Sequence, residues 1–182
     1  GYPVPAEFDA TLATILSWRR SHKTAHEEAF VTWLTNQLNN MGHKPFMMSS
    51  EANLVVTVPR TDGKVSTTLF SSHTDTCHSS IASDPQRQDV AYDGERGEIF
   101  LKGGKHGDCL GADDGAGVWL MLEMIRHKVP GTYVFHRGEE RGCIGSSAMA
   151  REKPDWLRKF EVAIAFDRKG FNEIITHQSS RR

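Results

Sequence analysis

Three apolar segments of the sequence each run toward a histidine or an acidic residue, and this feature limits the fold more than any other. They are residues 68–72 before His73, residues 133–136 before Glu139 and Glu140, and residues 162–166 before Asp167. Short apolar segments rich in β-branched and aromatic residues predict buried strands. In open α/β sheets, ligands bind beyond the carboxyl ends of the strands. We therefore expect these polar side chains to meet at one edge of a sheet.

Helical periodicity separates the expected strands. Apolar residues recur at helical spacing in residues 6–20 and again from about residue 25 to residue 40. Thr24 is a candidate N-cap for the second helix, and Glu27 would complete a capping box. The motif at residues 110–117 opens a third helix. Strands that alternate with helices predict an α/β domain, and we expect three α/β/α layers with a mostly parallel, mixed central sheet.

Shorter segments complete the expected domain. They are strands at residues 44–49, 53–59 and 172–176, a hairpin that turns at residues 93–97, and a helix near residues 146–151. The sequence has no internal repeat, low-complexity tract or inter-domain linker. We therefore interpret residues 1–182 as one catalytic-type domain.

The composition argues against several classes of partner. A formal net charge of −1 gives no general reason to expect nucleic acid or an anionic membrane as a partner. No apolar run approaches the roughly 20 residues that span a bilayer, and residues 1–5 do not resemble a secretory signal. The 3 cysteines, Cys77, Cys109 and Cys143, form no Cys-x-x-Cys pair. We therefore expect a cytoplasmic protein in a reducing compartment, without a cysteine-based zinc site.

Taken alone, each polar motif has a simpler interpretation as a surface turn, a helix cap or a solvated helix start. The motifs are His73-Thr74-Asp75, Asp113-Asp114 and Glu139-Glu140. Together, the three motifs indicate a functional site more specifically than any one of them alone, because each motif follows an expected strand or opens an expected helix.

The combined set of side chains favours a metal site. Several carboxylates at one edge repel each other unless protons or cations lie between them. One imidazole with carboxylates and no thiolate suits zinc, and also manganese or cobalt. Calcium would need more oxygen ligands from a contiguous loop, which the sequence lacks. Sites with two metals about 3.5–4 Å apart are common in hydrolases, so we expect a two-metal hydrolytic site.

Four motifs, in this order, resemble those of the co-catalytic zinc exopeptidases. They are Ser72-His73-Thr74-Asp75, Gly111-Ala112-Asp113-Asp114-Gly115-Ala116-Gly117, Gly138-Glu139-Glu140-Arg141-Gly142 and Ala165-Phe166-Asp167. This superfamily includes tripeptide aminopeptidases, glutamate carboxypeptidases and amino-acid deacylases. The amino-acid sequence of residues 110–114 is most similar to that of the tripeptide-aminopeptidase branch. The resemblance covers roughly residues 66–170 and implies the zinc-exopeptidase (phosphorylase/hydrolase-like) fold.

The resemblance also implies a role for each residue of the site. The implied metal ligands are His73 and Glu140 for one zinc, Asp167 for the second zinc, and Asp113 as the bridge between them. Asp75 would orient the imidazole of His73, and Glu139 would be the general base. The peptide bond after Asp113 is usually cis in this family.

One implied ligand has no counterpart in the sequence. The fifth ligand of the family is a second histidine, well downstream of the aspartate that Asp167 matches. His177 lies ten residues beyond Asp167 and is too early to match. We therefore expect residues 1–182 to lack the C-terminal part of the catalytic domain and any lid or dimerisation domain.

Residues beside the motifs have open roles. His78 is interpreted as a loop residue that faces water, His106 as a solvated loop residue or part of a substrate pocket, and His136 as structural. The arginines beside the acids could bind a substrate carboxylate or neutralise the acidic cluster. They are Arg137, Arg141 and Arg168.

The function implied by the resemblance is that of a zinc-dependent peptidase, an aminopeptidase that hydrolyses short peptides. Two alternatives stay open: an N-acyl-amino-acid deacylase that uses the same metals on a different amide, and a non-catalytic remnant that binds metal without turnover. A homo-oligomer is also left open.

Overall fold

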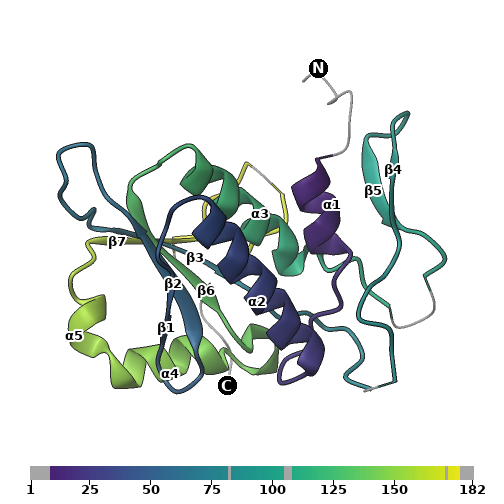
Figure 1. Cartoon of the computed structure of the whole chain (residues 1–182), viewed down its shortest axis with the longest axis horizontal. Coiled ribbons are helices and arrows are strands. Elements are labelled where there is room, and N and C mark those ends of the chain that lie inside the picture. Colours follow the sequence, from purple (N-terminus) through teal and green to yellow (C-terminus); the bar gives the residue numbers. More distant parts are fainter. Residues whose placement is uncertain (1–8, 82, 105–107, 171, 177–182) are drawn as a thin grey trace.

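The computed structural model describes residues 9–81, 83–104, 108–170 and 172–176. A five-stranded sheet of order β1-β2-β6-β3-β7 forms its middle layer (Figure 1). The strands are β1 (Phe46–Met48), β2 (Asn53–Val58), β3 (Thr68–His73), β6 (Gly131–His136) and β7 (Val162–Ala165). The β1-β2 and β2-β6 pairs are antiparallel, whereas β6, β3 and β7 run parallel to one another. The expected mixed sheet of an α/β domain is therefore confirmed.

Helices cover both faces of this sheet. On one face, α1 (Ala10–Leu16), α2 (Ala25–Asn40) and α3 (Ala112–Arg126) bury the larger apolar cluster. On the other face, α4 (Ile144–Glu152) and α5 (Pro154–Leu157) cover a smaller one. Alternating residues of a strand point to opposite faces, so on β6 Tyr133 and Phe135 join the first cluster and Val134 the second. Among the described residues, no helix is long and apolar enough to cross a bilayer.

The start of α2 differs from the expected capping box. The hydroxyl of Thr24 accepts a hydrogen bond from the Glu27 N–H at 3.3 Å, as expected of an N-cap. The Glu27 carboxylate, however, accepts from the N–H of Lys23 at 2.8 Å instead of that of Thr24. The reason is that Arg137 lies against the same carboxylate and draws it away from the N-cap.

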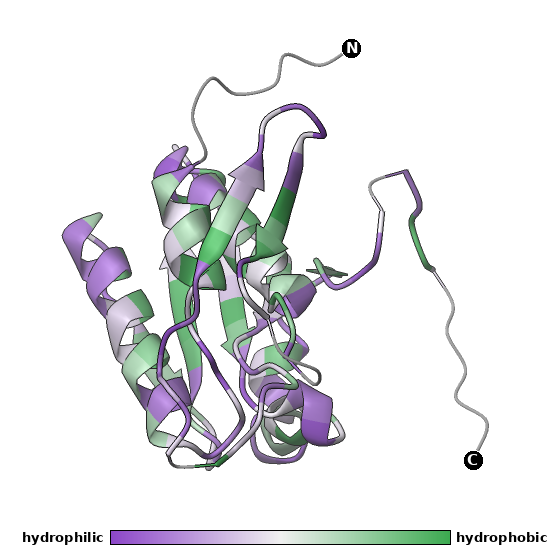
Figure 2. Ribbon diagram, turned by 90° about the vertical axis from the view of Figure 1, so that its right-hand side faces the viewer, coloured by the Kyte–Doolittle hydropathy of each residue, from purple (hydrophilic) through white to green (hydrophobic). Residues whose placement is uncertain are grey.

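A small hairpin and the end of the described chain lie outside the main layers. The hairpin consists of β4 (Val90–Asp93) and β5 (Glu98–Leu101) and stands beyond α1 in Figure 1. Residues 172–176 form no strand, so that expectation is wrong. Figure 2 shows why: this segment runs out from the body of the domain and meets no strand with which it could pair.

Strand β7 is exposed, although its apolar sequence predicts a buried strand. All four of its residues are exposed. Its one partner among the described residues is β3, and the exposed side chains include Val162 and Ile164. The apolar pattern identified the strand, but it could not indicate whether another segment of the protein buries the strand.

Candidate metal centre

The parallel strands bring the predicted polar residues to one edge of the sheet. His73 ends β3 directly opposite His136, the last residue of β6. The Nε2 atom of His73 lies 3.0 Å from Oδ1 of Asp113 and 3.7 Å from Oδ1 of Asp167. It also lies 3.7 Å from Oε2 of Glu139. Four of the six site residues predicted from the sequence therefore surround one point.

Three of these side chains form a group that could hold a metal ion. Within the described part of the chain, the donor atoms of His73, Asp113 and Asp167 all lie within 4.8 Å of one another. The side chain of His73 is 3% exposed, whereas that of Asp113 is 72% exposed. The imidazole thus forms a buried floor, and the carboxylates face solvent above it. Such a set of one nitrogen and several oxygen donors fits zinc, manganese or cobalt.

Electrostatics at this group also favour a bound cation. Burial by itself would lower the pKa of His73, but hydrogen bonds to Asp167 and Asp75 raise it to about 11. Burial and the nearby charge of Asp167 raise the pKa of Asp113. Carboxylates placed this closely need a positive charge among them. A divalent metal would supply that charge in place of the proton on His73.

Asp75 connects His73 to the turn that carries the two glutamates. The Nδ1 atom of His73 lies 3.0 Å from the main-chain oxygen of Asp75 and 3.5 Å from its Oδ1. The Asp75 carboxylate accepts the N–H groups of Glu139 at 3.0 Å and of Glu140 at 3.1 Å. Burial opposes ionisation, but the hydrogen bonds from His73 and the Glu139 N–H lower the pKa of Asp75. The carboxylate therefore stays charged, and it contacts both the imidazole at the end of β3 and the backbone of the turn that carries Glu139 and Glu140.

Asp114 is a buried part of the site to which the sequence assigned no role of its own. The Asp113–Asp114 peptide bond is cis, as the resemblance implied. The Asp114 carboxylate accepts the N–H of His73 at 3.1 Å and that of Gly117 at 3.2 Å. A Cβ atom at Gly117 would lie 2.3 Å from this carboxylate, so only glycine fits there. The adjacent acids Asp113 and Asp114 thus face opposite ways, one toward solvent and one into the protein.

Glu140 lies beside the group of three without belonging to it. Burial and the neighbouring Glu140 carboxylate raise the pKa of Cys77 to about 11. The thiol of Cys143 donates to Oε1 of Glu139 at 3.5 Å. Burial and the neighbouring Glu139 carboxylate likewise raise the pKa of Cys143.

Arg20 lies behind the site, and sequence patterns gave no sign of it. Its fully buried guanidinium donates to the main-chain oxygens of Thr74 at 2.8 Å, Gly111 at 2.9 Å and Ile15 at 2.8 Å. It also lies over the ring of Phe30 at 4.8 Å. Burial lowers the pKa of Arg20 to about 10, which leaves it charged at neutral pH. One cation therefore joins the loop after β3 to the start of α3.

Other histidines and arginines have different positions from those expected. His78 is buried and lies 2.6 Å from the Thr76 hydroxyl and 2.9 Å from Gln88 Oε1, so the water-facing interpretation is wrong. Thr76 and Gln88 supply polar partners for both ring nitrogens, which allows the ring to be buried. Arg137 is buried against Glu27, whereas Arg168 is exposed and pairs with Glu173. His106 and His177 lie outside the described residues.

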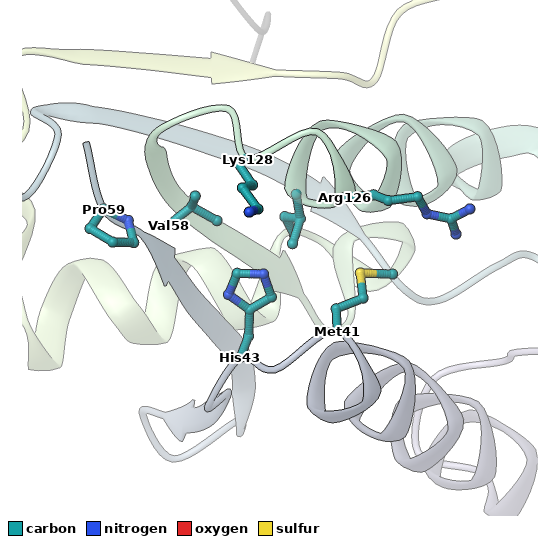
Figure 3. Close-up of a pocket in the computed structure, with 7 residues that line it drawn as sticks. Met41, His43, Val58, Pro59, Arg126 and Lys128 are labelled. Atoms are coloured by element: carbon teal, nitrogen blue, oxygen red, sulfur yellow. The ribbon is translucent and has the colours of Figure 1, made fainter. Parts of the chain in front are cut away.

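A pocket of about 340 Å³ lies away from this edge (Figure 3). It is lined by the ends of α2, β2 and α3, with Val58 and Ile125 as buried apolar residues and His43, Arg126 and Lys128 as basic ones. Val58 pairs with Gly131 at the amino end of β6, whereas the candidate site lies at the carboxyl end. None of the described residues that line the pocket is acidic, and the pocket is separate from the metal centre.

The fold is that of the co-catalytic zinc peptidase superfamily. More specifically, the chain belongs to peptidase family M28, whose family model matches residues 53–179. No curated protein sequence matches the chain significantly.

Solved structures of peptidases share the fold. The aminopeptidase PepT from Bacillus cereus is 26% identical, with a TM-score of 0.64 over 87% of this chain and 42% of its own. A tripeptidase from Staphylococcus aureus is 25% identical, with a TM-score of 0.65 over 88% of this chain and 42% of its own. The aminopeptidase LapA from Legionella pneumophila is similar in fold alone, with a TM-score of 0.59 at 19% identity over 88% of this chain and 42% of its own. The chain thus spans less than half the length of these relatives.

Proposed function

We propose that this chain is the metal-binding part of a two-zinc aminopeptidase that hydrolyses short peptides. The observation that carries the proposal is the group of His73, Asp113 and Asp167, with the Glu139 carboxylate 3.7 Å from the same imidazole. A buried nitrogen donor, solvent-facing carboxylates and an adjacent carboxylate that can accept a proton are the parts that metal-assisted hydrolysis needs.

The proposed ligands divide between two metal sites. His73 and Glu140 would bind one zinc, Asp167 would bind the other, and Asp113 would bridge them; manganese or cobalt would suit the same donors. Bound metals in such a site polarise the substrate carbonyl and lower the pKa of water. Asp75 would orient the imidazole of His73 from behind.

Glu139 is the proposed general base. Its carboxylate is half-buried beside the metal group, and its backbone N–H is fixed by the Asp75 carboxylate. Glu139 would accept a proton from the attacking water as the tetrahedral carbon forms. It would then return that proton to the departing amine as the C–N bond breaks. A carboxylate in a partly water-excluded pocket suits both steps.

The proposed substrate class rests on the relatives. Two of the similar structures are named as an aminopeptidase and a tripeptidase, which favours short peptides with a free amino terminus. An N-acyl-amino-acid deacylase would use the same residues on a different amide. A non-catalytic metal-binding domain would retain the ligands and show no turnover.

Metal analysis of the purified chain and hydrolysis of two substrate panels test these alternatives. Short peptides should be cleaved after zinc loading, and N-acyl amino acids should not. Cleavage of the N-acyl panel alone would favour the deacylase, whereas zinc binding without any hydrolysis would favour the non-catalytic domain.

Replacing Glu139 by Gln tests the role of the base. The variant should lose about 10²–10⁴-fold in kcat, the usual contribution of a general base, while its zinc content stays unchanged. Turnover near the wild-type rate would show that Glu139 is not the base.

A further inference from the structure

A buried ion pair links the first turn of α2 to the turn that carries Glu139. The fully buried carboxylate of Glu27 accepts two hydrogen bonds from Arg137, from Nε at 2.9 Å and from Nη2 at 3.1 Å. Arg137 is itself buried and also pairs with Glu28, which is exposed at the surface. Removing two charges from water costs several kcal/mol per ion, and an apolar pair of similar volume is often as stable. A contribution to the stability of the fold is therefore not enough to explain why the protein has this buried ion pair.

The backbone around Arg137 is held from several directions. Its N–H donates to Oδ1 of Asn53 at 3.2 Å, and its carbonyl accepts the N–H of Gly145 at 2.8 Å. The next residue, Gly138, has a φ of +67°, a conformation that favours glycine. Its carbonyl accepts the N–H of Ile144 at 3.0 Å. The backbone at Arg137 and Gly138, just before Glu139, is therefore held in one defined conformation.

His22 contacts the same turn from the opposite side. The Nδ1 atom of His22 lies 3.2 Å from the Glu27 carboxylate, and its side chain is buried. A Cβ atom at Gly138 would lie 2.8 Å from Nε2 of His22, so the ring packs directly on the Gly138 backbone. Among the described residues, Nε2 of His22 has no hydrogen-bond partner. Glu27 thus holds both Arg137, within the turn, and His22, against it.

We infer that Glu27 is a positioning residue for the general base: through Arg137 and His22 it fixes the turn at Gly138 and so the placement of the Glu139 carboxylate. This inference rests on the proposed role of Glu139. A proton acceptor that moves by about 1 Å can lose about 10²-fold in rate. The effect on metal binding should be smaller than the effect on kcat, because three of the four proposed ligands lie outside this turn, and His73 among them is fixed by Asp75 and Asp114. The fourth proposed ligand, Glu140, lies on the turn, and the Asp75 carboxylate still holds its N–H.

Glu27→Gln and Glu28→Gln form a matched pair of variants for the test. Both glutamates contact Arg137, but the Glu27 carboxylate alone of the two also lies against His22 and is buried. With zinc at saturation, Glu27→Gln should lower kcat about 10–100-fold and leave KM within about twofold. Glu28→Gln should leave kcat within about twofold, since exposed ion pairs contribute little. Wild-type kcat in the Glu27→Gln protein would overturn the inference.

Hydrogen exchange gives a readout that does not depend on activity. In Glu27→Gln, the amides of Glu139 and Glu140 should exchange about tenfold faster, while that of Val134 in the centre of β6 stays unchanged. Unchanged exchange at Glu139 and Glu140 would overturn the inference even if no substrate were hydrolysed. Full turnover in Glu139→Gln would show that Glu139 is not the general base. The Glu27 variants test only the positioning of the turn, so the two failures can be told apart.

The double variant Glu27→Met/Arg137→Met separates positioning from stability. Two apolar side chains should restore the melting temperature, because they remove both buried charges together. The loss in kcat should remain, because Met at position 27 cannot hold His22 or the backbone N–H of Lys23. Recovery of both melting temperature and kcat would show that the pair serves stability alone.

Discussion

The inner and outer sides of the candidate metal centre are held in different ways. The inner side consists of His73 and Asp75, which are buried. The backbone N–H of His73 donates to the Asp114 carboxylate, and the Asp75 carboxylate accepts the backbone N–H of Glu139. The outer side consists of Asp113 and Asp167, whose side chains are 72% and 37% exposed. Asp167 follows β7, whose one partner among the described residues is β3.

This difference separates a preformed part of the site from a part that depends on its surroundings. The inner side keeps its geometry through contacts with the core, so a metal meets an imidazole that is already oriented. On the outer side, exposed carboxylates can adjust, and a metal would order them when it binds. Substitutions on the inner side should therefore affect both folding and metal affinity, whereas substitutions near β7 should have small effects on stability.

The largest effect on stability is expected for Arg20→Met. The change removes the guanidinium that donates to the buried carbonyls of Thr74 and Gly111, of which the second keeps the N–H of Gly115. Hydrogen bonds to charged groups contribute about 1.5–3 kcal/mol each, so the free energy of unfolding should fall by about 3–5 kcal/mol. Urea denaturation measures the change. A loss below about 1 kcal/mol would mean that the inner side does not depend on this residue.

The next effect is a loss of metal affinity in Asp75→Asn. The amide removes the charge behind His73 and places an NH₂ group where an oxygen accepts a backbone N–H. Zinc affinity should fall about 10–100-fold, as is usual when a residue that orients a ligand is changed. Competition with a chromophoric chelator measures this. The control Glu173→Gln, near the outer side, should change affinity less than twofold.

A third prediction concerns pH and the inner side. Burial and the charge of His73 lower the pKa of His136 from 6.5 to about 4. Between these values the unfolded chain binds a proton that the folded chain does not, so stability falls as pH falls. From pH 7 to pH 5, the loss should be about 2 kcal/mol, and His136→Gln should not show this component. An equal loss in both proteins would contradict the lowered pKa of His136.

The smallest effect is expected beside the outer side. Arg168 pairs with Glu173 at 3.2 Å, and both side chains are more than half exposed. Arg168→Met should change the free energy of unfolding by less than about 0.5 kcal/mol. A loss as large as that of Arg20→Met would remove the distinction between the two sides.

Local sequence patterns predicted much of the fold because they report local preferences. Helix α2 lies at Ala25–Asn40 with Thr24 as its N-cap, where periodicity and capping placed it. The strand before Asp167 was identified, but its burial was not, since burial depends on other segments. The capping-box role of Glu27 failed for a similar reason, because Arg137 is 110 residues away in the sequence.

The sequence by itself determined the family and the set of polar residues at the carboxyl edge. Motifs such as His73-Thr74-Asp75 are contiguous, and a strand followed by an acidic residue can be predicted without knowing which strands lie beside it in the sheet. The tertiary structure alone decided which of these side chains meet, which are buried, and which distant residues hold them. No pattern marks Arg20, and the patterns that contain Glu27 and Asp114 do not indicate what these side chains contact. Their roles consist of contacts that form only when the chain is packed.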